Sequence, residues 1–369
     1  MTSLRFVGGV VVGGGEGLLI VDGRVAAPSG RDAPTFDLEG GFLLPGFIDT
    51  QVNGGGGVLF NDDPTVEAIV AIGAAHRRFG TTAFLPTLIS DDLDRVDMAM
   101  RAVEAAIEAG APGVVGIHLE GPFLNAPRRG AHDASKFRRL DAAAIALLSS
   151  LRVGKTLVTL APETCEAADI AALVRAGVVV AAGHTDATYR QAVEAFAGGV
   201  TGVTHLFNAM SPFSHRAPGV AGAALENRSV YCGLIADGRH VDPAALRVAV
   251  NARPRDRFML VTDAMPGVGS ASKSFTLQGR QIRVLDGVCV DDDGVLAGSN
   301  LDMATALRNM VAMAGVTLEE ASVMASAAPA AFLGLADRGV LAPGARADLV
   351  WLDAARHVRG VWIGGRRVV

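Results

Sequence analysis

The segment Phe47-Ile-Asp-Thr-Gln-Val52 ("FIDTQV") is the first of eight short runs of apolar and β-branched residues along the middle of the chain. Strands buried on both faces, as in a parallel sheet, read as near-continuous apolar runs. The other seven runs are Thr82–Pro86, Val114–Leu119, Thr156–Ala161, Val178–Ala182, Gly202–Leu206, Tyr231–Ala236 and Phe258–Thr262. Ala-rich stretches that read as helices lie between the runs, near 65–79, 92–109, 139–150, 165–176, 187–198 and 243–252.

Further helical stretches follow the eighth run, near 302–314, 317–327 and 329–334. Eight alternations of strand and helix fit an α/β fold of the (β/α)8 TIM-like barrel type, whose usual size is about 250 residues or more. A doubly wound open sheet also alternates strands with helices, so the alternation alone does not exclude it. We expect the barrel.

Both ends of the chain have a different pattern, with short β-like segments separated by Gly and Asp-Gly turns. The expected organisation is a small β-sandwich domain built from residues 1–44 plus 336–369, and a catalytic barrel over 45–335. Residues 272–296 interrupt the barrel pattern and read as three short strands with tight turns. We expect them to form a β insertion after the eighth barrel strand.

The 369 residues are 50% hydrophobic and 19% charged, which is the balance of a globular protein rather than a disordered one. A net charge of −5 and the lack of a Lys/Arg run argue against nucleic acid as a partner. Three widely spaced cysteines without a CxxC motif indicate a reduced, cytoplasmic compartment. No apolar run is long enough to suggest a membrane span, so we expect no membrane partner.

Polar residues stand where the predicted strands end, which is where barrel enzymes place their chemistry. The third run ends at Glu120, the fifth is followed by His184, and the sixth contains His205. Two histidines and one glutamate are the ligand set of many catalytic zinc sites, which keep a fourth position for water. A single barrel histidine is more often only a satisfied polar group, but three such residues at strand ends favour a metal site.

Asp263 follows the eighth run and could pair with a nearby histidine in a purely structural role. Beside a metal it is better placed to accept a proton from water as a general base. His132, Arg216 and His240 lie in loops after runs three, six and seven. Loops often carry substrate contacts, but spacing alone favours reading each of these as a solvated loop residue.

Six motifs together resemble the N-acetylglucosamine-6-phosphate deacetylases of the amidohydrolase superfamily: PGFIDTQVNG, HLEGPFLN, GHTDATY, THLFNAM, LVTDAM and LAGSNLDM. They occur in the family's order between about residues 45 and 303. HLEGPFLN followed by His132, together with THLFNAM, is specific to this family, whereas PGFID alone marks only the superfamily.

The resemblance implies a (β/α)8 barrel enzyme that hydrolyses N-acetyl-D-glucosamine 6-phosphate to D-glucosamine 6-phosphate and acetate in amino-sugar catabolism and cell-wall sugar recycling. It implies a divalent metal ion, for which we expect Zn²⁺ with Fe²⁺, Co²⁺ or Mn²⁺ as alternatives, and a homodimer. The implied roles are metal ligands at Glu120, His184 and His205, acid/base catalysis at Asp263, a contact of His132 with the acetamide carbonyl, and substrate contacts at Asn208, Ala209, Arg216 and His240.

Gln51 and Asn53 stand where many amidohydrolases carry His-x-His, which binds a second metal. Neutral amides are poor zinc ligands beside imidazole, so we interpret the pair as a vacated second-metal position. From these ligands we expect one metal ion per subunit, held by Glu120, His184 and His205. Two alternatives remain open at this stage. One is another amidohydrolase reaction, such as deacetylation of a different N-acetylhexosamine 6-phosphate. The other is a non-catalytic barrel that serves as a scaffold, although such proteins usually lose their metal ligands.

Overall fold

The computed structural model describes residues 3–15, 17–27 and 32–369, and its centre is a sheet of eight parallel strands. Within this sheet, each strand pairs with the one that precedes it in the chain order β7, β10, β11, β12, β13, β14, β15, β16. This order is that of a barrel, and it excludes the doubly wound sheet, in which the strand order reverses. The strands are β7 Phe47–Val52, β10 Thr81–Ile89, β11 Gly116–Glu120, β12 Lys155–Leu160, β13 Val179–Ala182, β14 Gly202–Val203, β15 Tyr231–Leu234 and β16 Phe258–Leu260.

The first and last strands meet beyond the end of β16. The Asp263 backbone N–H donates to the Gln51 carbonyl over 3.0 Å, and the Asn53 N–H donates to Ala264 over the same distance. Deeper in the barrel, the Thr262 hydroxyl donates to the buried carboxyl of Asp49 at 2.5 Å. These bonds form the seam of the barrel, where the segment after β16 lies against the end of β7.

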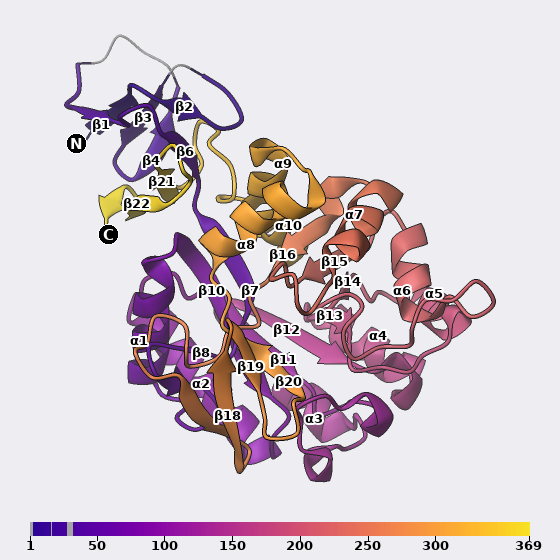
Figure 1. Cartoon of the computed structure of the whole chain (residues 1–369). Coiled ribbons are helices and arrows are strands. Elements are labelled where there is room, and N and C mark those ends of the chain that lie inside the picture. The colour runs from indigo at the N-terminus through magenta and orange to yellow at the C-terminus, as the bar shows by residue number, and fades with distance from the viewer. Residues whose placement is uncertain (1–2, 16, 28–31) are drawn as a thin grey trace.

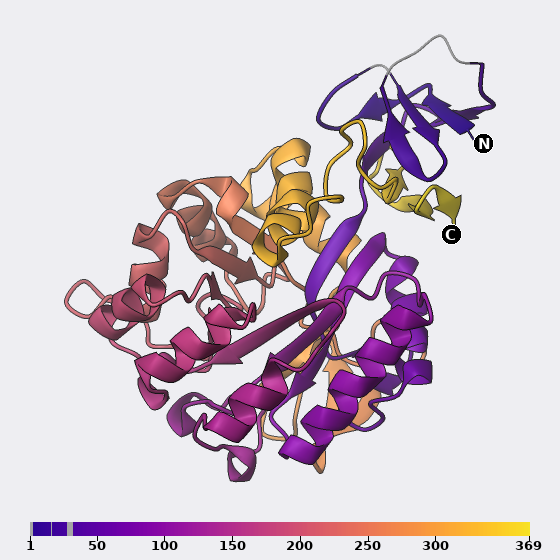
Figure 2. The ribbon, with the colours of Figure 1, turned by 180° about the vertical axis from the view of Figure 1, so that it is seen from behind.

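Helices surround the strands, as Figures 1 and 2 show from opposite sides. They are α1 Val66–Arg77, α2 Leu93–Glu108, α3 Ala142–Leu148, α4 Ala167–Arg175, α5 Tyr189–Ala197, α6 Gly219–Glu226, α7 Pro243–Ala252, α8 Met303–Asn309, α9 Leu318–Ser322 and α10 Ala328–Leu333. Side-chain caps begin several of them. Thr65 accepts from the Ala68 N–H before α1, and Thr188 forms a capping box with Gln191 before α5.

Helix α6 was not predicted, because glycines at 219 and 222 and the preceding proline read as a loop. The predicted helices at 302–314 and 317–327 are each an α-helix continued by a π-helical turn, Met310–Ala314 after α8 and Val323–Ala327 after α9. Short 3₁₀ turns occur at Ala126–Arg128, Ala134–Lys136, Pro162–Thr164 and Arg255–Arg257. In the described part of the chain, no helix combines the length and apolarity that crossing a membrane requires.

The two ends of the chain form two small sheets packed face to face, beside the barrel in Figure 1. One has the order β4-β3-β1-β5, and the other, β2-β6-β21-β22-β23, joins strands from both ends. Phe6 and Phe36 of the first sheet stack edge-on against Trp362 of the second, with ring centroids 5.1 and 5.3 Å apart. The predicted sandwich of both termini is confirmed.

The strands of the sandwich are β1 Ser3–Val7, β2 Val10–Val11, β3 Leu18–Val21, β4 Arg24–Ala26, β5 Thr35–Asp37, β6 Phe42–Pro45, β21 Leu349–Leu352, β22 Val358–Ile363 and β23 Arg366–Arg367. The predicted division between residues 44 and 45 falls inside β6. The domain limits 1–44, 45–335 and 336–369 remain a prediction.

The β insertion has four antiparallel strands, so the expectation of three was wrong. They are β17 Ser274–Leu277, β18 Arg280–Leu285, β19 Val288–Val290 and β20 Leu296–Ser299. The fourth was missed because it begins only at Leu296, the end of the expected insertion, and Gly298 breaks its alternation. Ser299 N–H donates to the Asp263 carbonyl at 2.8 Å, which joins the insertion to the mouth of the barrel. A two-stranded hairpin, β8 Gly54–Gly55 and β9 Val58–Leu59, follows β7.

Candidate active site

Three metal-ligating side chains meet at the mouth of the barrel. Glu120 ends β11, while His184 and His205 each lie two residues after the end of a strand, β13 and β14 respectively. His205 Nε2 lies 3.0 Å from Glu120 Oε1 and 3.1 Å from His184 Nε2. Each of the three residues is at most 5% exposed. Within the described residues this is the one group of three or more His, Cys, Asp or Glu side chains with ligand atoms within 4.8 Å of one another.

The hydrogen bonding of His184 suits a cation at this point. Its Nδ1 lies 2.9 Å from the Arg128 carbonyl oxygen, which can only accept, so Nδ1 carries the ring proton. Nε2, which lies 3.3 Å from Glu120 Oε1, is then the ring nitrogen that can bind a cation. Burial disfavours ionisation of Glu120, but its contacts with His184 and His205 hold its pKa well below 4.5. Two imidazoles and a carboxylate facing one point are the donors of a divalent metal site, and the residues fit such an ion.

The backbone is strained at these positions. His184, His205 and Asp263 have φ angles of 47°, 33° and 52°, in the left-handed region that residues other than glycine rarely adopt. Each such residue costs on the order of 1 kcal/mol or more, and the surrounding structure must impose it. The strained turns point side chains at successive strand ends toward a common centre, which regular strand geometry would not do.

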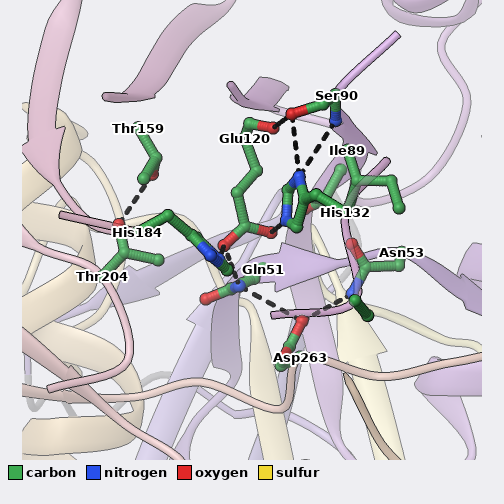
Figure 3. A network of polar contacts seen from close by, with 12 residues as sticks. Gln51, Asn53, Ile89, Ser90, Glu120, His132, Thr159, His184, Thr204 and Asp263 are labelled. Carbon is green, nitrogen blue, oxygen red and sulfur yellow. Dashed lines mark hydrogen bonds and ion pairs between the residues drawn. The ribbon is translucent and has the colours of Figure 1, made fainter. Parts of the chain in front are cut away.

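Asp263 receives hydrogen bonds from both amides of the first strand end (Figure 3). Its Oδ1 accepts from Gln51 Nε2 at 3.1 Å and from Asn53 Nδ2 at 2.6 Å. Gln51 Nε2 also donates to Glu120 Oε1 at 3.0 Å. Burial, followed by repulsion from Glu120, raises the pKa of Asp263 to about 6. The amides therefore present N–H donors toward two carboxylates.

His132 lies on the loop after β11 and approaches the same centre. Its Nε2 is 4.0 Å from Glu120 Oε2, and its ring centroid is 4.3 Å from that of His184. Burial is the main reason that the pKa of His132 lies well below 6.5. A neutral imidazole beside the cluster can donate one hydrogen bond to a ligand in the cavity.

The centre opens into a cavity of about 270 Å³. Its wall includes the candidate residues Glu120, His132, His184, His205, Asn208, Ala209, His240 and Asp263, together with Leu277, Leu296 and Gly298 of the insertion. His240 is held by its own strand end, because its Nδ1 lies 2.6 Å from Asp237 Oδ2. Arg216 is exposed on the loop 211–218 and is not among the residues that line the cavity.

Several side chains that support the site were not singled out from the sequence. Ser90 contacts His132 from the end of β10. The second run was predicted to stop at Pro86, whereas β10 continues to Ile89. Ser90 therefore stands at the true end of the strand, four residues beyond the predicted end. Asp49 could have been noticed as a carboxylate inside an apolar run. No local signal marks Gln278, which reaches the site from the insertion.

Comparisons with known proteins point to one family. A family model described as "Amidohydrolase family" matches residues 42–368. N-acetylgalactosamine-6-phosphate deacetylase of Shewanella sp. (strain ANA-3) is 41% identical over 343 residues, 92% of this chain and 86% of that protein. N-acetylglucosamine-6-phosphate deacetylase of Homo sapiens is 38% identical over 354 residues, 90% of this chain and 84% of that protein.

Solved structures show the same likeness. N-acetylglucosamine-6-phosphate deacetylase from Pasteurella multocida superposes with a TM-score of 0.95 at 32% identity, covering 99% of both chains. A mutant of N-acetyl-D-glucosamine-6-phosphate deacetylase from Mycobacterium smegmatis, in complex with N-acetyl-D-glucosamine-6-phosphate, gives a TM-score of 0.91 at 35% identity and covers 100% of both chains.

Proposed function

This chain belongs to the amidohydrolase family, and on that premise we propose that it hydrolyses N-acetyl-D-glucosamine 6-phosphate to D-glucosamine 6-phosphate and acetate, in amino-sugar catabolism and cell-wall sugar recycling. The observation that carries the proposal is the meeting of Glu120, His184 and His205 with one further carboxylate, Asp263, and one further imidazole, His132, in a single cavity. These are the groups that hydrolysis of an unactivated amide requires.

Glu120, His184 and His205 would hold one divalent cation, which supplies a Lewis acid for the amide carbonyl and lowers the pKa of water. Asp263 takes a proton from the attacking water as the new C–O bond forms. It then gives this proton to the amide nitrogen as the C–N bond breaks, so that acetate and the amine leave and one water is consumed. Oδ2 is the oxygen free for this transfer, because Gln51 and Asn53 both donate to Oδ1.

His132 would donate from Nε2 to the carbonyl oxygen of the acetamide as negative charge develops there. A buried, positioned donor is worth more to the transition state than to the neutral amide, because the charge on the oxygen grows along the reaction. Burial keeps the ring neutral, so it donates a hydrogen bond without adding a second positive charge beside the cation.

Asn208, Ala209 and His240 line the cavity and would contact the sugar phosphate. Arg216 does not line the cavity of its own chain, and we propose a homodimer in which the loop 211–218 carries it to the cavity of the neighbouring copy. Arg suits this role because its planar fork pairs with phosphate oxygens. Light scattering would measure the oligomeric state, and a monomer with full activity would contradict the proposal.

Mixed dimers would test the exchange of Arg216 directly. Arg216→Ala and Asp263→Asn should each be inactive alone. After subunit exchange at equal concentrations, half of the dimers are mixed and each has one complete site, so about one quarter of wild-type activity should return. Mixing that restores no activity, although mixed dimers form, would place Arg216 in its own chain's site. Wild-type activity of Arg216→Ala alone would place Arg216 outside the reaction.

Zn²⁺ is the cation we propose, because two imidazoles and one carboxylate suit it, with Fe²⁺, Co²⁺ or Mn²⁺ as alternatives that availability would select. We also propose a cytoplasmic location, because Cys165, Cys232 and Cys289 are all free thiols.

A second candidate substrate is N-acetyl-D-galactosamine 6-phosphate. It is favoured by the relative from Shewanella sp., whose 41% identity exceeds the 38% of the human N-acetylglucosamine-6-phosphate deacetylase. The two sugars differ only in configuration at one hydroxyl, and nothing in the donor set of the cavity distinguishes them. The ratio of kcat/KM for the two phosphates decides between these substrates.

Metal content and acetate release, measured on the same purified protein, test the proposed function. We expect about one divalent ion per chain, acetate release from N-acetyl-D-glucosamine 6-phosphate, and loss of activity with a chelator that the metal restores. A protein that binds no metal and releases no acetate from either hexosamine phosphate would instead be a non-catalytic scaffold.

A further inference from the structure

The loop that carries His132 is held in place by the β insertion. The Asp133 N–H donates to Gln278 Oε1 at 2.6 Å, and Gln278 Nε2 donates to the Ser90 carbonyl at 2.9 Å. Arg280 Nη2 donates to the carbonyl of Ala131. The insertion thus contacts the residues on both sides of His132, and it also contacts Ser90, the residue against which the His132 ring packs.

Gln278 occupies a costly position in the hairpin between β17 and β18. Leu277 pairs with Arg280, so Gln278 and Gly279 form a two-residue turn, with φ angles of 46° and 79°. Two positive φ angles in a two-residue hairpin favour Asn, Asp or Gly at the first position, because other side chains are strained there. A glutamine in this position is explained by its side chain, which makes one hydrogen bond as an acceptor and one as a donor.

Ser90 determines which nitrogen of His132 carries the proton (Figure 3). The Ser90 backbone N–H and hydroxyl lie 3.3 and 2.8 Å from His132 Nδ1. A backbone N–H can only donate, so Nδ1 holds a lone pair and the ring proton is on Nε2. The Ser90 hydroxyl also lies 3.4 Å from the Glu120 carbonyl oxygen. In the opposite tautomer, His132 Nδ1–H would donate to the Ser90 hydroxyl, and the hydroxyl would donate to the Glu120 carbonyl. That tautomer is disfavoured because the Nδ1 proton would face the proton of the Ser90 backbone N–H.

We propose that Gln278 and Ser90 are positioning residues, through which the β insertion fixes His132 with its proton on Nε2, directed into the cavity. The catalytic consequence rests on the proposed deacetylation, whereas the tautomer does not. With the proton on Nε2, His132 can donate to the acetamide oxygen. With the proton on Nδ1, a lone pair would face the developing negative charge and raise the barrier.

The tautomer can be read directly in the metal-loaded protein by ¹⁵N NMR of the histidine rings. The chain has eight histidines, and loss of one signal set in His132→Gln identifies the ring. We expect wild-type His132 to show an unprotonated Nδ1 and a protonated Nε2. A protonated Nδ1 would overturn the proposal, whether or not the protein proves to be a deacetylase.

Substitution of Gln278 tests the link from the insertion. Gln278→Leu removes both side-chain hydrogen bonds, and Gln278→Glu keeps only the acceptor for Asp133 N–H. Both should mix the His132 tautomers and lower kcat about 10- to 100-fold, with KM and metal content nearly unchanged. Gln281→Leu, on the neighbouring strand β18, is the matched control, because its amide donates only to Phe275 within the hairpin.

Ser90→Ala separates the two contacts that Ser90 makes with His132 Nδ1, because it removes the hydroxyl and keeps the backbone N–H. We expect the tautomer to persist and kcat to fall less than in Gln278→Leu. Circular dichroism of each variant checks folding. Wild-type kcat in both Gln278 variants, or an unchanged His132 spectrum in them, would refute the role of the insertion.

Discussion

Replacement of Asp263 by asparagine separates proton transfer from structure unusually well. The two side-chain donors that reach Asp263, from Gln51 and Asn53, both end on Oδ1. Asparagine can keep a carbonyl oxygen at that position and put its NH₂ group where Oδ2 now lies. The substitution therefore removes the oxygen that would accept the proton and retains the two hydrogen bonds that orient the side chain.

The magnitude follows from this geometry. General acid–base catalysis contributes about 10²- to 10⁴-fold, which is about 2.7–5.4 kcal/mol at 1.36 kcal/mol per tenfold change in rate. Stability should change little, because two opposing effects are involved. Hydrogen bonds to a neutral acceptor are weaker than those to a carboxylate, but the buried repulsion between Asp263 and Glu120 disappears. Metal content should be unchanged, because Glu120, His184 and His205 are intact.

The assay is acetate release from N-acetyl-D-glucosamine 6-phosphate by metal-loaded protein, with metal measured on the same sample by mass spectrometry. Asp94→Asn, exposed in the first turn of α2, is the matched control and should keep wild-type kcat. Asp263→Asn that keeps its metal and turns over within about tenfold of wild type would refute the assignment of Asp263 as the base.

Other consequences concern pH, the metal and the barrel seam. Because burial raises the pKa of Asp263 to about 6, kcat/KM should fall as pH drops below about 6 and the base is protonated; a profile that stays flat to about pH 5 would contradict it. Burial raises the pKa of Asp49 from 3.8 to about 7, so its contribution to stability is complete below pH 3.8 and is lost as pH rises through about 7. Asp49→Asn should flatten the pH dependence of the urea midpoint in that window, and an unchanged slope would argue against the shift. His184→Ala should lose the bound cation in equilibrium dialysis, and stoichiometric metal in this variant would exclude His184 as a ligand. Wild type should bind about one ion per chain, because Gln51 presents an N–H donor rather than a lone pair to Glu120; two tightly held ions would contradict this reading.

The barrel could be predicted because its strands carry a signal that does not depend on distant residues. Strands buried on both faces have near-continuous apolar sequence, and eight such runs were recognisable. Where local sequence contains glycine or proline, the prediction was poorer. Helix α6 was missed for its glycines, and the second strand was ended too early at Pro86. Both errors arise because tertiary packing stabilises segments whose local propensity is weak.

The candidate site was predictable to the extent that its residues stand at strand ends. Parallel strands of a barrel end at one face, so Glu120, His184, His205 and Asp263 could be grouped without knowing any distance. The contacts of Gln278 could not be inferred in this way. It reaches Ser90 across 188 positions of sequence, and only the folded insertion brings the two together.

The pairing of β6 with β21 has a consequence for the order in which the protein folds during synthesis. Phe42–Pro45 lies between β2 and β21 in its sheet, and Leu349–Leu352 is made about 300 residues later. At ribosomal rates of about 5–20 residues per second, one edge of β6 waits for its partner for roughly 15–60 s. Through that interval the nascent chain carries an unpaired strand edge, which can pair with other chains. The first strands to leave the ribosome are thus among the last to be completed, and a chain halted before Leu349 would display this edge beside the finished part of its barrel.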